Sequence, residues 1–443
     1  MGVPRVAGER FAINWLLMNA GRLFFASCVA LVTTSMVFSI RGDILDALSA
    51  DFHINKQQTG MILSPAFWGF TISILVGGSL VDFFGMRRLL TLSSWGYIVA
   101  VLAILFAPRP AAPVYPDYSD PGFLILYAAM LTLGLSQGLV EGVINPLCAT
   151  LYSDNKTHRM NVLHAWWPGG LIIGGLAAYG ITKAMDLDQS GVSTATATLG
   201  WQMKLGLLIV PAVAYWVLIR GQRFPETERV AAGVSTADMC REALRPGFIL
   251  IWVMMWMKAA TELGPDQWVG SLITNLTGMQ GVLILVYTAG LMFVLRFFVG
   301  GVAHHVPPHA LLAVCSVLAA AGLFGLSRVS TPVEAFVAAT LFGVGKTYFW
   351  PVMLGITAEQ FPKGGALLLA IMGGTGNLSV AFILPIMGGW YDTAGAAAAF
   401  RYVGYLPMVL TALFGALYLY HRAQGGYRAV KLQAHTEAAR VAD

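Results

Sequence analysis

Long apolar runs, separated by short polar segments, make up most of the chain. A membrane-spanning helix needs about 20 consecutive apolar residues, and the runs are long enough for twelve such helices. The longest polar interval, 222–246, separates the first six runs from the last six. The pattern predicts two six-helix halves, 1–221 and 247–421, joined by a linker over 222–246 and followed by a tail over 422–443. The predicted spans are 23–49, 57–81, 88–107, 121–151, 160–184, 201–220, 247–275, 279–302, 309–328, 332–358, 364–389 and 397–421.

Composition places these helices in a lipid bilayer rather than in a soluble core. Of the 443 residues, 57% are apolar and 11% carry a charge, whereas a soluble domain carries about 25% charged residues. A membrane barrel would show short alternating segments instead, so we predict an all-α membrane protein. The four cysteines are scattered, the net charge of +5 lies in loops, and no nucleophile–base or metal-ligand spacing occurs. A disulfide scaffold, nucleic-acid binding, a metal, a cofactor and an enzymatic activity are therefore not expected.

Basic residues between the spans predict the orientation in the membrane. With the N-terminus inside, seventeen Lys and Arg residues fall on the cytoplasmic side and six on the outer side. We therefore expect both termini in the cytoplasm and the chain in the inner (cell) membrane. The apolar run after Arg5 and Arg10 is longer than the core of a signal peptide, so we interpret it as a retained first helix.

The two halves resemble each other in sequence. The segment 76–82 ends the second span, and the similar segment 299–305 ends the eighth. Asn145-Pro146 in the fourth span has a counterpart in Trp350-Pro351 of the tenth. Two parallel six-helix halves, with a substrate site between them near the midplane, are the architecture of the major facilitator superfamily, which the chain resembles.

The loop after the second span strengthens this resemblance. It matches the cytoplasmic motif of the superfamily, G-x-x-x-D-x-x-G-x-R-[KR]. The glycines permit a tight turn and close helix packing, and the aspartate can pair with a basic group or a helix terminus. The motif residues are Gly78, Asp82, Gly85, Arg87 and Arg88.

Acidic residues within the spans are candidates for proton coupling, because an ionisable group inside a membrane faces a cavity or a partner. Glu141 lies deep in the apolar fourth span, where a carboxyl group is suited to carry a proton. The alternative role of Glu141 is structural, with the protonated acid forming a hydrogen bond to a neighbouring helix. Asp43 follows Arg41 and Gly42, so it either faces the cavity or marks the aqueous end of the first span.

Charged residues of the second half are candidates for substrate binding. Lys258, Glu262 and Asp266 are spaced four apart on one helix face, which allows either a structural salt bridge or a cavity role. Arg296 and Lys346 have no acid nearby in sequence, so each needs an acid from another helix or a polar ligand.

Polar and aromatic groups within the spans suggest a neutral polyhydroxylated substrate. Aromatic rings stack on sugar rings and on cations, although lipid-facing packing is the alternative for each of them. These polar and aromatic groups and the charged residues of the second half together form the predicted substrate-binding set. Its members are Asn145, Asn161, His164, Trp256, Lys258, Glu262, Arg296, Lys346, Tyr348 and Asn377.

Four segments resemble the fucose permease branch of the superfamily, the fucose–galactose–glucose:proton symporters. They are GDILDAL in the first span, VEGVINP in the fourth, RFFVGG with VPPHALLAV around the eighth, and GGTGNLSVAFILPIMGGWYDTAG in the eleventh. The resemblance implies proton-coupled sugar uptake, with Asp43 and Glu141 as protonation sites and Arg296 in substrate binding. Its partners would be a small-molecule substrate and protons, and members of this superfamily commonly act as monomers.

Two lysines depart from that branch and keep other substrates open. Lys258 and Lys346 add positive charge within the membrane, so a sugar acid, another organic anion or a drug is the alternative cargo. The alternative to a transporter is a sensor with the same fold, which would bind the substrate without moving it across the membrane.

Overall fold

The computed structural model describes residues 19–111, 113, 118–152, 156–187, 192–225, 236–297, 306–361, 364–428 and 430. Within these ranges every regular element is a helix. The first group comprises α2 (Ala20–Asp43), α3 (Leu45–Asp51), α4 (Lys56–Phe84), α5 (Met86–Leu105), α6 (Pro121–Leu151), α7 (Lys156–Ala184), α8 (Thr194–Gly206) and α9 (Ile209–Ile219). After the short α11 (Thr236–Ala243), the second group comprises α12 (Pro246–Thr277), α13 (Val282–Phe297), α15 (Pro308–Leu326), α16 (Pro332–Thr347), α17 (Phe349–Gln360), α18 (Gly365–Ala394), α19 (Ala396–Val403) and α20 (Tyr405–Ala423).

These helices account for the twelve predicted spans. Nine segments of the described chain are long and apolar enough to cross a membrane, and Val282–Arg296 is a shorter apolar helix. The two remaining predicted spans are occupied by α7 and by α16 with α17. Four spans are broken into two helices, which the apolar pattern did not predict: α2–α3, α8–α9, α16–α17 and α19–α20.

Prolines explain three of the four breaks. Pro211, Pro351 and Pro407 are each the third residue of the second helix of a broken span. A proline lacks the N–H that would bond the carbonyl four residues earlier, and its ring clashes with that carbonyl. In each case the earlier carbonyl lies at or just beyond the end of the preceding helix, so the ladder stops there and restarts.

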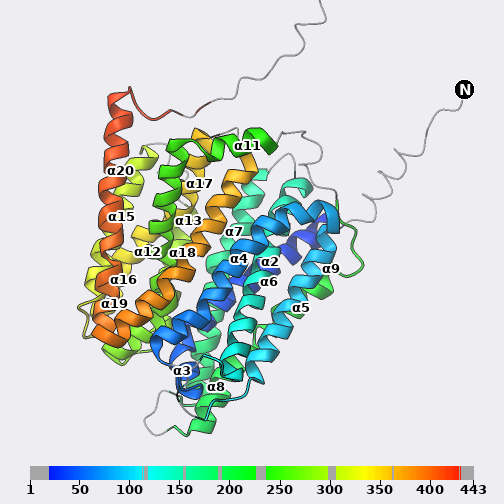
Figure 1. Ribbon diagram of the computed structural model, residues 1–443, viewed down its shortest axis with the longest axis vertical. Helices are drawn as coiled ribbons and strands as arrows, with labels where there is room; N and C mark the ends of the chain where they lie inside the picture. Colours follow the sequence, from blue (N-terminus) through cyan, green and yellow to red (C-terminus); the bar gives the residue numbers. More distant parts are fainter. Residues whose placement is uncertain are drawn as a thin grey trace, which may run out of the picture.

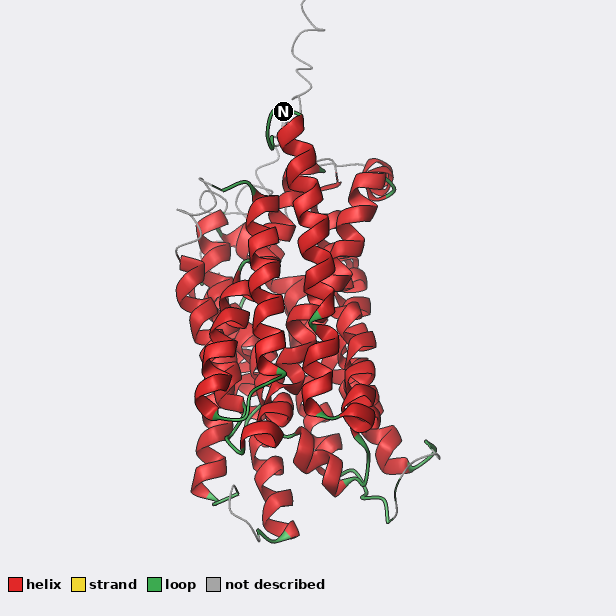
Figure 2. Cartoon of the chain, turned by 90° about the vertical axis from the view of Figure 1, so that its left-hand side faces the viewer, coloured by secondary structure: helices red, strands yellow, loops and turns green. Residues whose placement is uncertain are grey.

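The two groups of helices lie side by side, and both ends of the chain leave the bundle on the same side (Figure 1). We call this side, which carries the start of α2 and the end of α20, the terminal end. The opposite side, which carries α3 and α8, is the distal end. Most helices run between the two ends (Figure 2).

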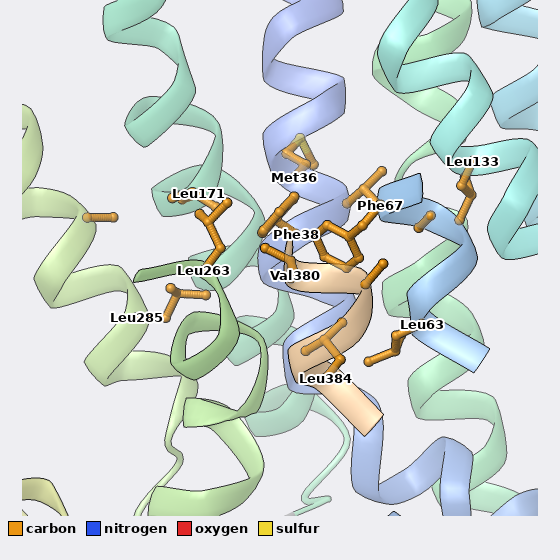
Figure 3. Packing of buried hydrophobic residues seen from close by; sticks show 14 of the residues in the cluster. Met36, Phe38, Leu63, Phe67, Leu133, Leu171, Leu263, Leu285, Val380 and Leu384 are labelled. Atoms are coloured by element: carbon orange, nitrogen blue, oxygen red, sulfur yellow. The ribbon is translucent and has the colours of Figure 1, made fainter. Parts of the chain in front are cut away.

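The groups meet along three helix pairs, α4 with α18, α2 with α12 and α7 with α13. The Oγ of Ser64 donates to the carbonyl of Ala381 at 2.5 Å. Gly60 lies so close to α18 that a Cβ there would be 2.6 Å from the carbonyl oxygen of Leu384. Apolar side chains fill the contact, and Phe38 and Phe67 lie next to Val380 and Leu384 (Figure 3).

Hydrogen bonds tie the groups together at the distal end. Asp392 at the end of α18 accepts from the backbone N–H groups of Lys56 (3.2 Å) and Gln57 (2.8 Å), the first residues of α4. Asp46 accepts from Ser271 (2.6 Å) and Asn275 (3.2 Å) and also pairs with Lys56. One carboxylate from each group thus binds groups of the other.

The motif loop connects α4 to α5. Gly85 has φ of 81°, in the left-handed region that suits glycine, and it ends α4 where α5 begins. Arg87 and Arg88 are exposed. The surroundings of Gly78 and the side chain of Asp82 lie outside the described residues, so the expected pairing of Asp82 stays a prediction.

Candidate functional site

Three predicted residues of the first group form a connected polar set. Asn145 lies one turn after Glu141 on α6, and its Nδ2 donates to the carbonyl of Glu141 at 3.1 Å. His164 of α7 places Nε2 2.9 Å from Oδ1 of Asn145. The carboxylate of Glu141 is half-buried and forms no hydrogen bond or ion pair with any residue in the described ranges. Among the described residues, this carboxylate therefore has no partner.

Arg296 of α13 brings a positive charge to this set from the second group. Its Nε donates to the carbonyl of Thr347 at 3.4 Å. It lies within electrostatic reach of both His164 and Glu262. The Asn145–His164 pair and Arg296 thus approach each other from the two groups, which is where a substrate between the halves would bind.

The structure divides the predicted Lys258–Glu262–Asp266 row into two ion pairs. Lys258 Nζ lies 2.5 Å from Glu262 Oε2, in contact but without the angle of a hydrogen bond. The same ammonium lies 4.1 Å from the centre of the Trp350 ring, a cation–π contact. Asp266 instead pairs with Lys346 of α16, whose Nζ donates to both carboxylate oxygens at 2.5 and 2.7 Å. Lys346 therefore pairs with an acid from another helix, one of the two partners expected from the sequence.

Asp43, Tyr348 and Asn377 bond groups other than the predicted residues above, which we call the cluster. Asp43 ends α2, and its carboxylate pairs with Lys204 of α8 at 2.6 Å. Tyr348 caps α16 and donates to the carbonyl of Leu295 at 3.1 Å. Asn377 is buried on α18 and donates to the carbonyl of Gly373 within its own helix.

Trp256 contributes no described contact to the cluster. Trp256 packs against Trp252 and against Phe382, which is 59% exposed. Its indole Nε1 is nevertheless buried and has no hydrogen-bond partner among the described residues. The side chain of Asn161 lies outside the described residues.

A pocket of about 420 Å³ lies at the distal end, apart from the cluster. Its lining includes Asp46, His53, Lys56, Tyr391 and Asp392. Both of its carboxylates already bind groups across the interface. The pocket therefore belongs to the distal contact between the two groups rather than to the cluster.

Sequence reasoning missed one charged residue, Arg41 of α2. It is 1% exposed and fully inside the bundle, although Gly42 and Asp43 made it resemble a helix end. Its place after an uninterrupted apolar run from Leu23 to Ile40 was the signal that could have identified it, since such a charge within a span needs a partner or a function.

Comparisons with known proteins agree with this geometry. A sequence model of the Major Facilitator Superfamily matches residues 23–338. The voltage-gated purine nucleotide uniporter SLC17A9 of Rattus norvegicus is 29% identical over 150 residues, 33% of this chain and 30% of that protein. The matched part thus spans less than a third of that relative.

Solved structures match over much more of the chain. The inward-open conformation of the xylose transporter XylE from E. coli has a TM-score of 0.72 at 14% identity, covering 90% of this chain and 96% of that one. The E. coli fucose:proton symporter FucP has a TM-score of 0.57 at 15% identity, covering 88% and 98%. At these identities the likeness shows the fold alone.

Fold and comparisons together define a class, a multi-pass helical membrane transporter and not an enzyme. The family match covers more than half of the chain, so the chain belongs to the Major Facilitator Superfamily. The resemblance predicted from the paired halves is confirmed at this level.

Proposed function

We propose that the chain is a proton-coupled symporter that moves a sugar or a close chemical relative of a sugar across the inner (cell) membrane. The observation that carries the proposal is the free carboxylate of Glu141, half-buried in an apolar helix beside the Asn145–His164 pair. Protonation of Glu141 removes a charge from the site before the halves rearrange. Two structural neighbours are a xylose transporter and a fucose:proton symporter, which supports a sugar as cargo.

In this proposal the halves 1–221 and 247–421 are the moving bodies, and a single chain is the working unit. The linker 222–246 and the tail 422–443 lie in the cytoplasm, on the terminal end, as the basic residues predict. The hydrogen bonds at the distal end would then close the outer side, a state that fits the likeness to an inward-open transporter. Asp43, held by Lys204, is the second candidate for protonation.

Arg296 favours a second candidate cargo, an organic anion. Its guanidinium forms no ion pair within 4 Å in the described ranges and lies among the groups that line the proposed site. The purine nucleotide named for the curated relative is itself an anion. A sugar acid would satisfy both the hydrogen-bonding groups and this charge.

Uptake into proteoliposomes under an imposed inward proton gradient tests the proposal. We expect accumulation of a neutral sugar or a sugar acid in the wild type. Glu141→Gln should lose gradient-driven accumulation but keep substrate exchange, because glutamine mimics the protonated acid. Glu359→Gln, at an exposed glutamate of the terminal end, is the matched control and should behave as the wild type. Equal loss of accumulation and exchange in Glu141→Gln would assign that residue a structural role instead.

A further inference from the structure

Arg41 is a buried cation held between two aromatic rings at the contact between the halves. Its guanidinium carbon lies 5.1 Å from the centre of the Phe38 ring and 4.7 Å from that of Phe67. Both rings belong to the apolar contact in Figure 3. Cation–π contacts of this kind fix the plane of the guanidinium, so its donors keep a set direction.

Most of those donors are unused. Nε donates to Oε1 of Gln267 at 2.9 Å, but Nη1 and Nη2 are buried and have no hydrogen-bond partner. Gln267 in turn donates to the carbonyl of Phe38 at 3.2 Å. Among the described residues, the only hydrogen-bond partner of this charge is therefore a neutral amide from the opposite half.

This arrangement differs from that of the buried lysines. Each of them forms an ion pair with a carboxylate: Lys204 with Asp43, Lys258 with Glu262 and Lys346 with Asp266. Arg41 forms no ion pair within the described part of the chain. A buried charge without a counter-charge is strongly unfavourable, so this group needs a counter-charge that the described part of the fold does not supply.

The contact that covers Arg41 is one that alternating access must open. Next to it, Gly42 and Gly270 bring α2 and α12 so close that a Cβ on Gly270 would be 2.8 Å from the carbonyl oxygen of Gly42. When the distal end opens, Gln267 leaves with α12. The paired Nη groups of Arg41 then face the gap, and two parallel N–H donors of arginine match a carboxylate or phosphate.

We propose that Arg41 binds the anionic group of the transported substrate in the conformation open at the distal end, and that Gln267 covers it in the conformation described here. The inference rests on the proposed transport function and narrows its substrate class to compounds that carry a carboxylate or phosphate. A sugar acid unites such a group with the hydroxyl groups that Asn145 and His164 can bind.

Transport by Arg41→Met and Gln267→Met in proteoliposomes tests the proposal, with an aldonate, a sugar phosphate and a neutral hexose as separate substrates. Arg41→Met should weaken the apparent affinity for the anionic substrate by about 10- to 100-fold, the usual range for a lost hydrogen bond to a charged group. Gln267→Met keeps the guanidinium and should leave that affinity within about threefold of the wild type. The aldonate and the sugar phosphate show which anionic group is preferred.

Stability measurements separate binding from folding. Because Arg41 has no counter-charge, Arg41→Met should melt in detergent at or above the temperature of the wild type. A large loss of melting temperature together with equal loss of every substrate would overturn the proposal, and so would unchanged anion affinity in Arg41→Met. If the wild type carries only neutral hexose in a proton-dependent way, the inference about Arg41 fails while the proposed function stands. If it moves no solute under a proton gradient, the proposed function fails.

Discussion

Neutralising Asp266 alone should destabilise the protein far more than neutralising Asp266 and Lys346 together. Both side chains are buried, and the ammonium contacts both carboxylate oxygens. In Asp266→Asn the ammonium stays inside the bundle without a counter-charge, which costs about 3–5 kcal/mol. In the double variant Asp266→Asn/Lys346→Met neither charge remains, and replacing a buried pair by neutral groups is often neutral or stabilising by about 1–4 kcal/mol.

Denaturant unfolding in detergent micelles measures this difference. Arg245→Gln is the control, because it breaks the Glu242–Arg245 pair, whose arginine side chain is 56% exposed. Its cost should stay below that of Asp266→Asn, because only Glu242 is buried in this pair and the arginine is replaced at the surface, where water screens the charges. If Asp266→Asn costs no more than this control, or if the double variant is as unstable as the single one, the reasoning is wrong.

The same variants decide what Lys346 does in transport. A stable double variant that still accumulates substrate assigns the pair to holding α12 against α16. A stable double variant that no longer transports assigns Lys346 to the substrate, as the sequence predicted.

Two further predictions concern the transport cycle. Gly60→Ala places a Cβ against the backbone of α18 and should shift the population toward the conformation open at the distal end. Faster labelling of a cysteine introduced at Ser49, which is buried at the distal end, measures this shift. Gly180→Ala, with open space around it, should leave that rate unchanged, and equal rates in both variants would refute the closed distal contact. If Arg41 binds a monoanion and Glu141 carries the proton, their summed charge is the same in the empty and the loaded carrier. A pH gradient should then drive accumulation, whereas a potassium diffusion potential alone should not. Uptake driven by the potential would contradict the transport of one proton with each monoanion.

The sequence predicted the spans well because burial in lipid requires long apolar runs, which are visible without any partner. It did not predict that four of the spans are broken. Pro351 was visible as a possible bend, but a proline bends or ends a helix according to how its neighbours satisfy the freed carbonyl. Pro65 and Pro146 lie inside continuous helices, so the residue type alone does not decide between the two outcomes.

The sequence indicated candidate members of the site, which stay predictions, but it did not indicate their pairings. Glu141 and Arg296 were found because an ionisable residue in an apolar run is conspicuous. The partner of Lys346 was not found, because Asp266 lies 80 positions away in the chain and the local spacing assigned it to the row with Glu262. Arg41 was missed because a neighbouring glycine and aspartate are typical of a helix end, whereas its burial arises from the opposite half.

The distribution of polar contacts follows the division into halves. Every ion pair whose two members are both described joins residues of one half, from Asp43–Lys204 in the first to Asp266–Lys346 in the second, except Glu242–Arg245, which lies within the linker. The described contacts across the interface are instead hydrogen bonds, such as Arg41 to Gln267 and Lys56 to Asp392, together with apolar packing. A hydrogen bond contributes about 1 kcal/mol net because water can replace it. Removing one partner of a buried ion pair costs about 3–5 kcal/mol. Strong contacts within each half and replaceable ones between the halves allow the two bodies to separate at the distal end while each stays intact.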